Sequence, residues 1–178
     1  LPLSWEMERL KMAIGFDLGR EDIKSTRLNN HFRWHEGAFF SLNPHLSKLN
    51  VNLDLRLDHY SEGLGTEFSH NFSVAYHLTQ DLKLRASTGR SFRIPSYTEL
   101  YYFSPANRGN QNISPEHAWH LEGGMDFLQP NWEIEATVFH RWGRDVIDWI
   151  DMGTYWQVQN LIQVNTLGIT LNFATWWR

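Results

Sequence analysis

The chain has 178 residues, no cysteine and a formal net charge of −4 at pH 7. The lack of cysteine excludes disulfides, thiolate nucleophiles and cysteine metal sites, and the scattered basic residues offer no surface for nucleic acid. No run reaches the roughly 18 apolar residues of a membrane helix. Even so, the chain contains 9 Trp and 15% aromatic residues at a mean hydropathy of −0.47, more Trp than so polar a soluble protein usually needs.

Alternation of apolar and polar residues predicts β-strands along most of the chain. In the segment 49–60 Val51, Leu53, Leu55 and Leu57 point one way and their polar neighbours the other. The predicted strands, in chain order, are 10–18, 32–42, 49–60, 68–78, 82–88, 119–127, 132–142 and 155–173. The last strand changes parity between Val158 and Leu161, which predicts a bulge. We expect about eight antiparallel strands and no convincing helix.

The predicted connections alternate between short and long. Residues 43–47, 79–81 and 129–131 form short turns built from Pro, Asn and Asp, residues that favour tight turns. Residues 20–30, 59–67, 90–117 and 145–154 form longer connections. An up-and-down meander with short turns at one end and long loops at the other is typical of outer-membrane β-barrels.

A soluble antiparallel sheet also alternates, so two further features bear on the choice. The polar face is rich in charge, as expected of a watery lumen: Asp54, Arg56, Asp58, Lys83, Arg85, Glu133, Glu135 and Arg141. Several Trp residues stand near predicted strand ends, where amphipathic rings favour a membrane interface: Trp34, Trp119, Trp132, Trp142, Trp149 and Trp156. Both features favour a transmembrane barrel.

The segment 82–127 carries the most specific motifs. A strand ends in Phe-Arg-x-Pro, a Glu-Leu-Tyr follows, and an Asn-x-Asn and a Pro-Glu lead into the next strand; the residues are Phe92, Arg93, Pro95, Glu99, Leu100, Tyr101, Asn110, Asn112, Pro115 and Glu116. Together with the Arg-x-Asp-x-Tyr strand at 56–60 and the Asn- and Gly-containing strand at 160–173, this order closely resembles the barrel of TonB-dependent outer-membrane receptors.

The resemblance implies an all-β, up-and-down transmembrane barrel of about 22 strands, of which this chain supplies about eight. Residues 1–178 are then a partial barrel domain, a fragment without the plug domain, the early strands or the terminal strands. An intact receptor would lie in the outer membrane of a Gram-negative bacterium and contact its lipid. It would take up a scarce ligand, a ferric siderophore or cobalamin, with energy from the TonB complex acting through the absent plug.

Candidate ligand-binding residues lie in the segment 89–116, which the resemblance makes an extracellular loop. Aromatic rings and guanidinium groups can stack on or pair with an iron chelate or corrinoid; the candidates are Arg93, Tyr97, Tyr101, Tyr102, Phe103 and Arg108. Alternatively, Phe92, Arg93 and Pro95 fix the exit from the strand, and the tyrosines form an interfacial belt.

We expect no catalytic residue, resident cofactor or metal site. His140 is separated by alternation from Glu133 and Glu135. The nine histidines form no His-x-His pair, and the one His-x-x-x-His spacing, His31 and His35, falls at the start of a predicted strand, where positions four apart lie about 13 Å from each other. Residues 94–111 contain no histidine, which disfavours haem as the ligand within the resembled family. Two other interpretations stay open: a small eight-stranded outer-membrane barrel with an adhesive or structural role, and a soluble β-domain that binds carbohydrate.

Overall fold

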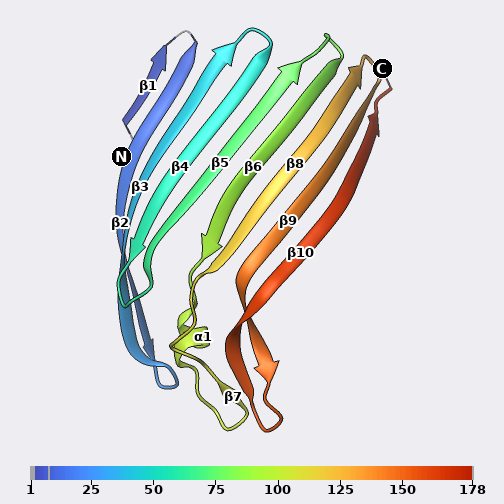
Figure 1. The fold of residues 1–178 in the computed structure, drawn as a ribbon. Coiled ribbons are helices and arrows are strands. Elements are labelled where there is room, and N and C mark those ends of the chain that lie inside the picture. The colour runs from blue at the N-terminus through green and yellow to red at the C-terminus, as the bar shows by residue number, and fades with distance from the viewer. Residues whose placement is uncertain (1–2, 8, 178) are drawn as a thin grey trace.

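A computed structural model describes residues 3–7 and 9–177, and almost all of them belong to one curved sheet (Figure 1). Eight strands are 12 to 20 residues long, and two short strands and one short helix accompany them. The elements are β1 (Leu3–Met7), β2 (Leu10–Ser25), β3 (Asn29–Leu46), β4 (Leu49–Tyr60), β5 (Gly65–His77), β6 (Leu82–Arg93), α1 (Tyr97–Tyr101), β7 (Asn107–Arg108), β8 (Glu116–Gln129), β9 (Trp132–Asp151) and β10 (Trp156–Thr175). The predicted eight antiparallel strands are confirmed.

The strands pair in chain order, β1-β2-β3-β4-β5-β6-β8-β9-β10, and β7 joins the far edge parallel to β10. Within the described residues β1 does not pair with β10, so the sheet is an open arc. The interpretation as a small closed barrel of eight strands is therefore wrong for this chain. An arc of this kind supplies one sector of a larger barrel.

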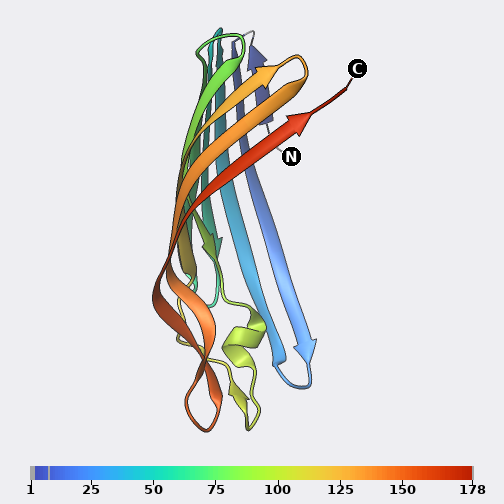
Figure 2. The ribbon, with the colours of Figure 1, turned by 90° about the vertical axis from the view of Figure 1, so that its right-hand side faces the viewer.

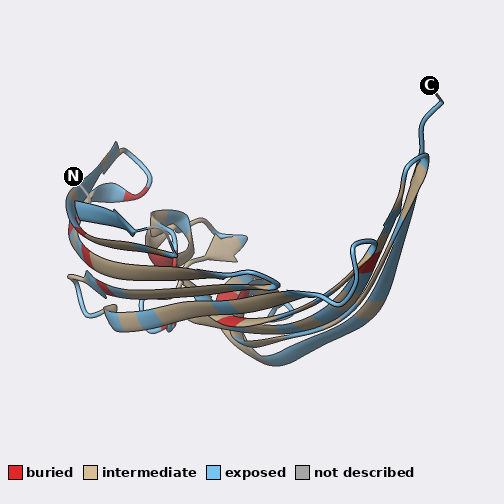
Figure 3. Ribbon diagram, turned by 90° about the horizontal axis from the view of Figure 1, so that it is seen from above, coloured by how far each residue is buried: buried red, intermediate tan, exposed pale blue. Residues whose placement is uncertain are grey.

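The two faces of the arc differ in chemistry because side chains alternate along each strand. The sheet curves around α1 and the loop that carries it (Figures 2 and 3). Arg33 contacts this loop, so its face is the concave one, and by alternation Gly37, Arg56 and Asp126 share it. The convex face exposes large apolar side chains, among them Phe16, Leu57, Phe72, Leu84, Leu121, Val138, Leu167, Ile169 and Leu171.

Aromatic rings bound the apolar band of the convex face at both ends. Trp132 packs against Phe127 at the short-turn end, and Trp142 stacks on Trp119 at the other. Ten residues separate the two tryptophans along β9, which at about 3.4 Å per residue and a tilt of about 40° spans roughly 26 Å. This height matches the apolar band of an outer-membrane barrel. In the described part of the chain, no helix is long and apolar enough to cross a membrane.

Three expectations about local structure are corrected. The segments 20–30, 59–67 and 145–154 are mostly strand, because the hairpins continue beyond the apolar band and close in short turns. Only 94–115 remains a long connection, and it includes α1, a helix the alternation did not predict.

The predicted bulge in β10 is also wrong. Its pairing with β9 keeps one register throughout, and only the pair of Asp145 and Ile162 is missing, where Asp145 has a φ of 55°. The apolar parity changes for another reason: Val158 is 0% exposed beneath the loop on the concave face, whereas Leu167 faces outward. The environment changes along the strand, and the register does not.

Val138 provides a test of the convex face, because it lies near the middle of the apolar band and is 52% exposed. In the complete barrel, Val138→Arg should lower the free energy of unfolding by roughly 2 to 4 kcal/mol, the cost of a charge near the bilayer midplane. Val138→Trp should cost much less, because lipid accommodates a larger ring whereas a packed core resists overfilling. Folding titrations into lipid vesicles compare the two variants. Equal damage from Trp and Arg would contradict a lipid-facing position.

Candidate functional site

The loop between β6 and β8 crosses the concave face and begins with a capped helix. Ser96 Oγ accepts a hydrogen bond from the Glu99 backbone N–H at 3.3 Å, and the Glu99 carboxylate accepts one from the Ser96 N–H at 2.7 Å. This reciprocal pair is a capping box. The sequence Ser-Tyr-Thr-Glu therefore starts α1 directly after Pro95, although the helix has only five residues.

Arg93 fastens the two ends of this loop together. Its guanidinium donates to both carboxylate oxygens of Glu99, at 2.9 and 3.0 Å, and to both of Glu116, at 3.0 and 2.7 Å. Glu116 also accepts a bond from the Ile147 backbone N–H at 2.6 Å. Two bidentate pairs on one guanidinium are a strong, directional contact. Arg93, Glu99 and Glu116, which we call the Arg93 clamp, thus join β6, α1, β8 and β9.

The contacts within the Arg93 clamp shift the pKa values of Arg93, Glu99 and Glu116. Partial burial opposes ionisation of Glu99 and Glu116, but hydrogen bonds from Arg93 outweigh it and hold the pKa of each carboxyl below its ordinary value. The same bonds to Glu116 and Glu99 raise the pKa of Arg93. All three groups are charged at neutral pH.

One flank of the loop rests on the hairpin of β2 and β3. Arg33 is 6% exposed and donates to the Pro95 carbonyl at 2.9 Å and to Glu21 at 2.7 Å. Its guanidinium lies 4.7 Å from the ring centroid of Tyr97. Further along α1, the Tyr101 ring stacks on His31 with 3.6 Å between centroids. Sequence reasoning missed both residues. Arg33 was on the polar face of the predicted strand 32–42 and His31 lay just outside that strand, and neither position reveals what the side chain contacts.

The other flank is bound to β10. β7 pairs with Trp156 and Gln157, and the Asn110 side chain donates to the Val158 carbonyl at 3.1 Å. Beneath this flank Leu100, Ile113, Ile147 and Val158 form the buried apolar cluster of the described chain. Gly109 lies so close to α1 that a Cβ would stand 2.9 Å from the Glu99 carbonyl oxygen. The loop is thus a bridge between β2–β3 and β9–β10.

The structure divides the predicted binding residues into two groups. Arg93, Tyr97 and Tyr101 are engaged in the contacts described above, and Tyr102 packs edge-on against Trp149, with centroids 6.5 Å apart. Phe103 and Arg108 instead lie at the loop tip.

At the tip, Phe103 is 68% exposed. The Arg108 guanidinium lies 3.8 Å from the ring centroid of Tyr155 and 5.7 Å from that of Phe103. Its Nε is buried without a hydrogen-bond partner among the described residues. Tyr155 comes from the β9–β10 turn and was not predicted, since only the folded chain brings that turn beside the loop. We call Phe103, Arg108 and Tyr155 the loop-tip cluster.

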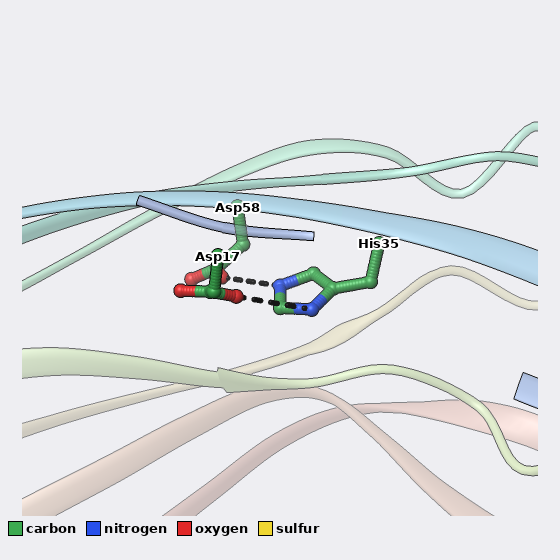
Figure 4. Close-up of side chains that lie close together, drawn as sticks. All are labelled: Asp17, His35 and Asp58. Atoms are coloured by element: carbon green, nitrogen blue, oxygen red, sulfur yellow. Dashed lines mark hydrogen bonds and ion pairs between the residues drawn. The ribbon is translucent and has the colours of Figure 1, made fainter. Parts of the chain in front are cut away.

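A separate ion cluster lies on the concave face of β2, β3 and β4 (Figure 4). The two ring nitrogens of His35 lie 2.6 Å from Asp58 Oδ1 and 3.5 Å from Asp17 Oδ1. These three side chains could supply one ligand atom each to a metal ion. However, the Arg56 guanidinium already donates to Asp58 at 2.7 Å and to Asp17 at 3.0 Å. The arrangement is a charge network that ties β2, β3 and β4 together.

Comparison with known protein families shows the family to which this chain belongs. Residues 14–178 match the family described as "TonB dependent receptor-like, beta-barrel". The chain therefore belongs to the TonB-dependent receptor family and supplies part of its barrel, as the sequence motifs had indicated.

Individual relatives agree with this family. The chain is 25% identical over 171 residues to a vitamin B12 transporter BtuB of Vibrio vulnificus, covering 91% of this chain and 27% of the relative. A BtuB of Photobacterium profundum is 26% identical over 102 residues, 57% of this chain and 14% of the relative. The chain thus spans well under a third of the curated relatives it matches.

Solved structures share the fold. The siderophore receptor PirA of Pseudomonas aeruginosa superposes with a TM-score of 0.85 at 19% identity, over 97% of this chain and 35% of that receptor. The copper transporter OprC superposes with a TM-score of 0.78 at 18% identity, over 99% of this chain and 34% of that protein. The named relatives and neighbours are transporters and receptors.

The Arg93 clamp makes the order of the loop depend on pH. Because the pKa values of Glu99 and Glu116 are lowered from 4.5, their stabilising effect is complete above about pH 4.5 and is lost as pH falls through the folded values. In the complete receptor, amide exchange in residues 96–114, corrected for its intrinsic pH dependence, should stay slow from pH 8 to 6 and accelerate below pH 4.5.

Arg93→Gln should abolish the acceleration at low pH and speed exchange about fivefold at pH 7, because two acidic groups then face each other unpaired until they are protonated. Arg141→Gln is the control: its pair with Glu122 on the same face is exposed and contributes little. Slow exchange in Arg93→Gln at pH 7 would show that the clamp does not hold the loop.

Proposed function

We propose that this chain forms part of the barrel wall of a TonB-dependent receptor that takes up a ferric siderophore or cobalamin across the outer membrane of a Gram-negative bacterium. The observation that carries the proposal is the loop-tip cluster, held over the concave face in a chain of this receptor family. The names of the relatives support the ligand classes: vitamin B12 for BtuB and a siderophore for PirA.

In this proposal residues 1–178 are a partial barrel domain. The remaining strands close the barrel and pair the edges of β1 and β10, since unpaired backbone groups are costly in lipid. A plug domain elsewhere in the receptor fills the lumen and contacts the TonB complex. The chain itself contributes lipid contact on its convex face and ligand contact on its concave face, and it has no enzymatic role.

Within the loop we assign different roles to the predicted residues. Phe103 and Arg108 contact the ligand together with Tyr155. An exposed ring, and a guanidinium that has no hydrogen-bond partner among the described residues, suit stacking on a planar or anionic chelate. Arg93, Tyr97, Tyr101 and Tyr102 hold the tip in place through the clamp, Arg33, His31 and Trp149. A rigid support of this kind lowers the entropy lost on binding.

Replacing the tip tests the binding role. In cells that carry the full-length receptor, the double variant Phe103→Ala/Arg108→Gln should bind the labelled ligand about tenfold more weakly, through lost stacking and cation–π contact. Radiolabelled cobalamin and ferric chelates are the probes. Arg20→Gln/Phe32→Ala is the matched control, since Arg20 lies 4.7 Å over Phe32 in a similar pair on the convex face. Unchanged binding by the tip variant would contradict its ligand role.

Trypsin tests the orientation, because two basic residues flank β3 at opposite ends. Arg27 is exposed in the turn between β2 and β3, and Lys48 is exposed in the turn between β3 and β4. Longer loops of outer-membrane barrels face the exterior, so trypsin on intact cells should cut at Arg27 and spare Lys48. Permeabilised cells should be cut at both. Cutting at Lys48 alone in intact cells would reverse the orientation.

A further inference from the structure

The convex face carries a second arrangement of rings and guanidinium groups, beyond the apolar band. Trp119 of β8 and Trp142 of β9 are register partners whose rings stack with centroids 6.4 Å apart. They end the band on the loop side, one outward position beyond Leu121 and two beyond Val138. Rings at this level lie where the lipid headgroups begin.

Arg144 occupies the next outward position of β9. It is exposed, and its guanidinium lies 5.6 Å from the Trp119 ring centroid. No hydrogen bond or ion pair from Arg144 to another residue occurs in the described part of the chain. Arg144 thus presents an unmatched positive charge beside two tryptophans.

The neighbouring ionisable groups contact one another rather than Arg144. Arg90 also lies 5.6 Å from the Trp119 ring, but it donates to Glu67 at 3.0 Å. Glu67 also contacts His117 at 2.9 Å, and Asp145 lies 3.7 Å from the other nitrogen of the same His117. Neither of these two carboxylates has an ion pair with Arg144 in the described part of the chain, so its guanidinium remains open to an external anion.

A second outward arginine shows the contrast. Arg20 lies 4.7 Å from the ring of Phe32 and 5.5 Å from that of Trp34, so it has the same aromatic setting as Arg144. It differs in one respect: Asp22 neutralises it at 2.7 Å. Of these two arginine–aromatic sets, only the one at Arg144 lacks a carboxylate from its own chain.

We propose that Arg144, Trp119 and Trp142 form a binding site for the phosphate of a lipid headgroup in the outer leaflet. A guanidinium donates two parallel hydrogen bonds to a phosphate, and the indole rings pack against the apolar part of the same lipid. The site adjoins the lipid-facing band, which makes a lipid the occupant and a dissolved phosphate ion a competitor. This inference rests on the orientation given in the proposed function.

Native mass spectrometry of the full-length receptor tests the site. The receptor is placed in phosphatidylcholine nanodiscs containing a small fraction of bisphosphorylated lipid A, and the lipid retained after release is counted. Wild type should retain about fivefold more lipid A than Arg144→Gln, the gain expected for one arginine near a charged headgroup. Arg144→Lys keeps the positive charge but loses the two parallel N–H donors of the guanidinium, so it should retain an amount of lipid A between those of wild type and Arg144→Gln.

Three results would overturn the proposal. These are equal retention by wild type and Arg144→Gln, an equal loss in the matched control Arg20→Gln, and displacement of lipid A by millimolar inorganic phosphate. Heat-modified mobility on gels confirms that each variant is folded, and Arg144→Lys remains informative if Arg144→Gln does not fold. A reversed trypsin pattern would refute the orientation, whereas lost enrichment with the pattern intact would refute the lipid site alone.

Discussion

Backbone hydrogen bonding in an apolar medium is the constraint on which this structure depends. In hydrocarbon each unpaired N–H or C=O costs several kcal/mol, so the chain can cross only if every strand is paired on both sides. The long antiparallel ladders from β2 to β10 meet this demand within the arc. Period-two alternation follows, since each strand then has one face toward lipid and one toward the lumen. The apolar convex face and the charged concave face are consequences of that pairing.

The concave face carries many charged side chains, which must be accommodated in the confined space of the lumen. Its ionic groups are joined in networks across strands: Asp17, His35, Arg56 and Asp58 on β2 to β4, and Lys83, Arg85 and Asp126 on β6 and β8. Opposite charges on neighbouring strands satisfy one another, so the wall stays polar without isolated buried ions. The loop is held by the same kind of ion pairing, because the single guanidinium of the Arg93 clamp joins both ends of the loop.

The loop between β6 and β8 is anchored to the sheet on both of its flanks. It rests on β2–β3 through Arg33 and on β10 through Asn110, so its tip is held over the lumen from both sides. The small buried cluster of Leu100, Ile113, Ile147 and Val158 lies beneath it. Elsewhere the described residues form no second layer against which the sheet could pack. Apolar packing in the described part of the chain therefore supports this loop, and the strands carry their remaining large apolar side chains on the convex face.

The sequence alone determined the eight strands, their up-and-down order, the two faces and the receptor family, because period two and the motif from Phe92 to Glu116 are local patterns. It did not reveal that the hairpins at 20–30, 59–67 and 145–154 continue as strands, since alternation weakens where both faces meet water. It predicted a bulge where Val158 merely turns toward the loop. The sequence also did not predict which residues contact the candidate residues. Arg33 and His31 on one flank and Tyr155 on the other are distant in sequence from the loop. Only the curvature of the sheet brings them to Arg108 and α1, because long-range contacts depend on closure of the whole arc.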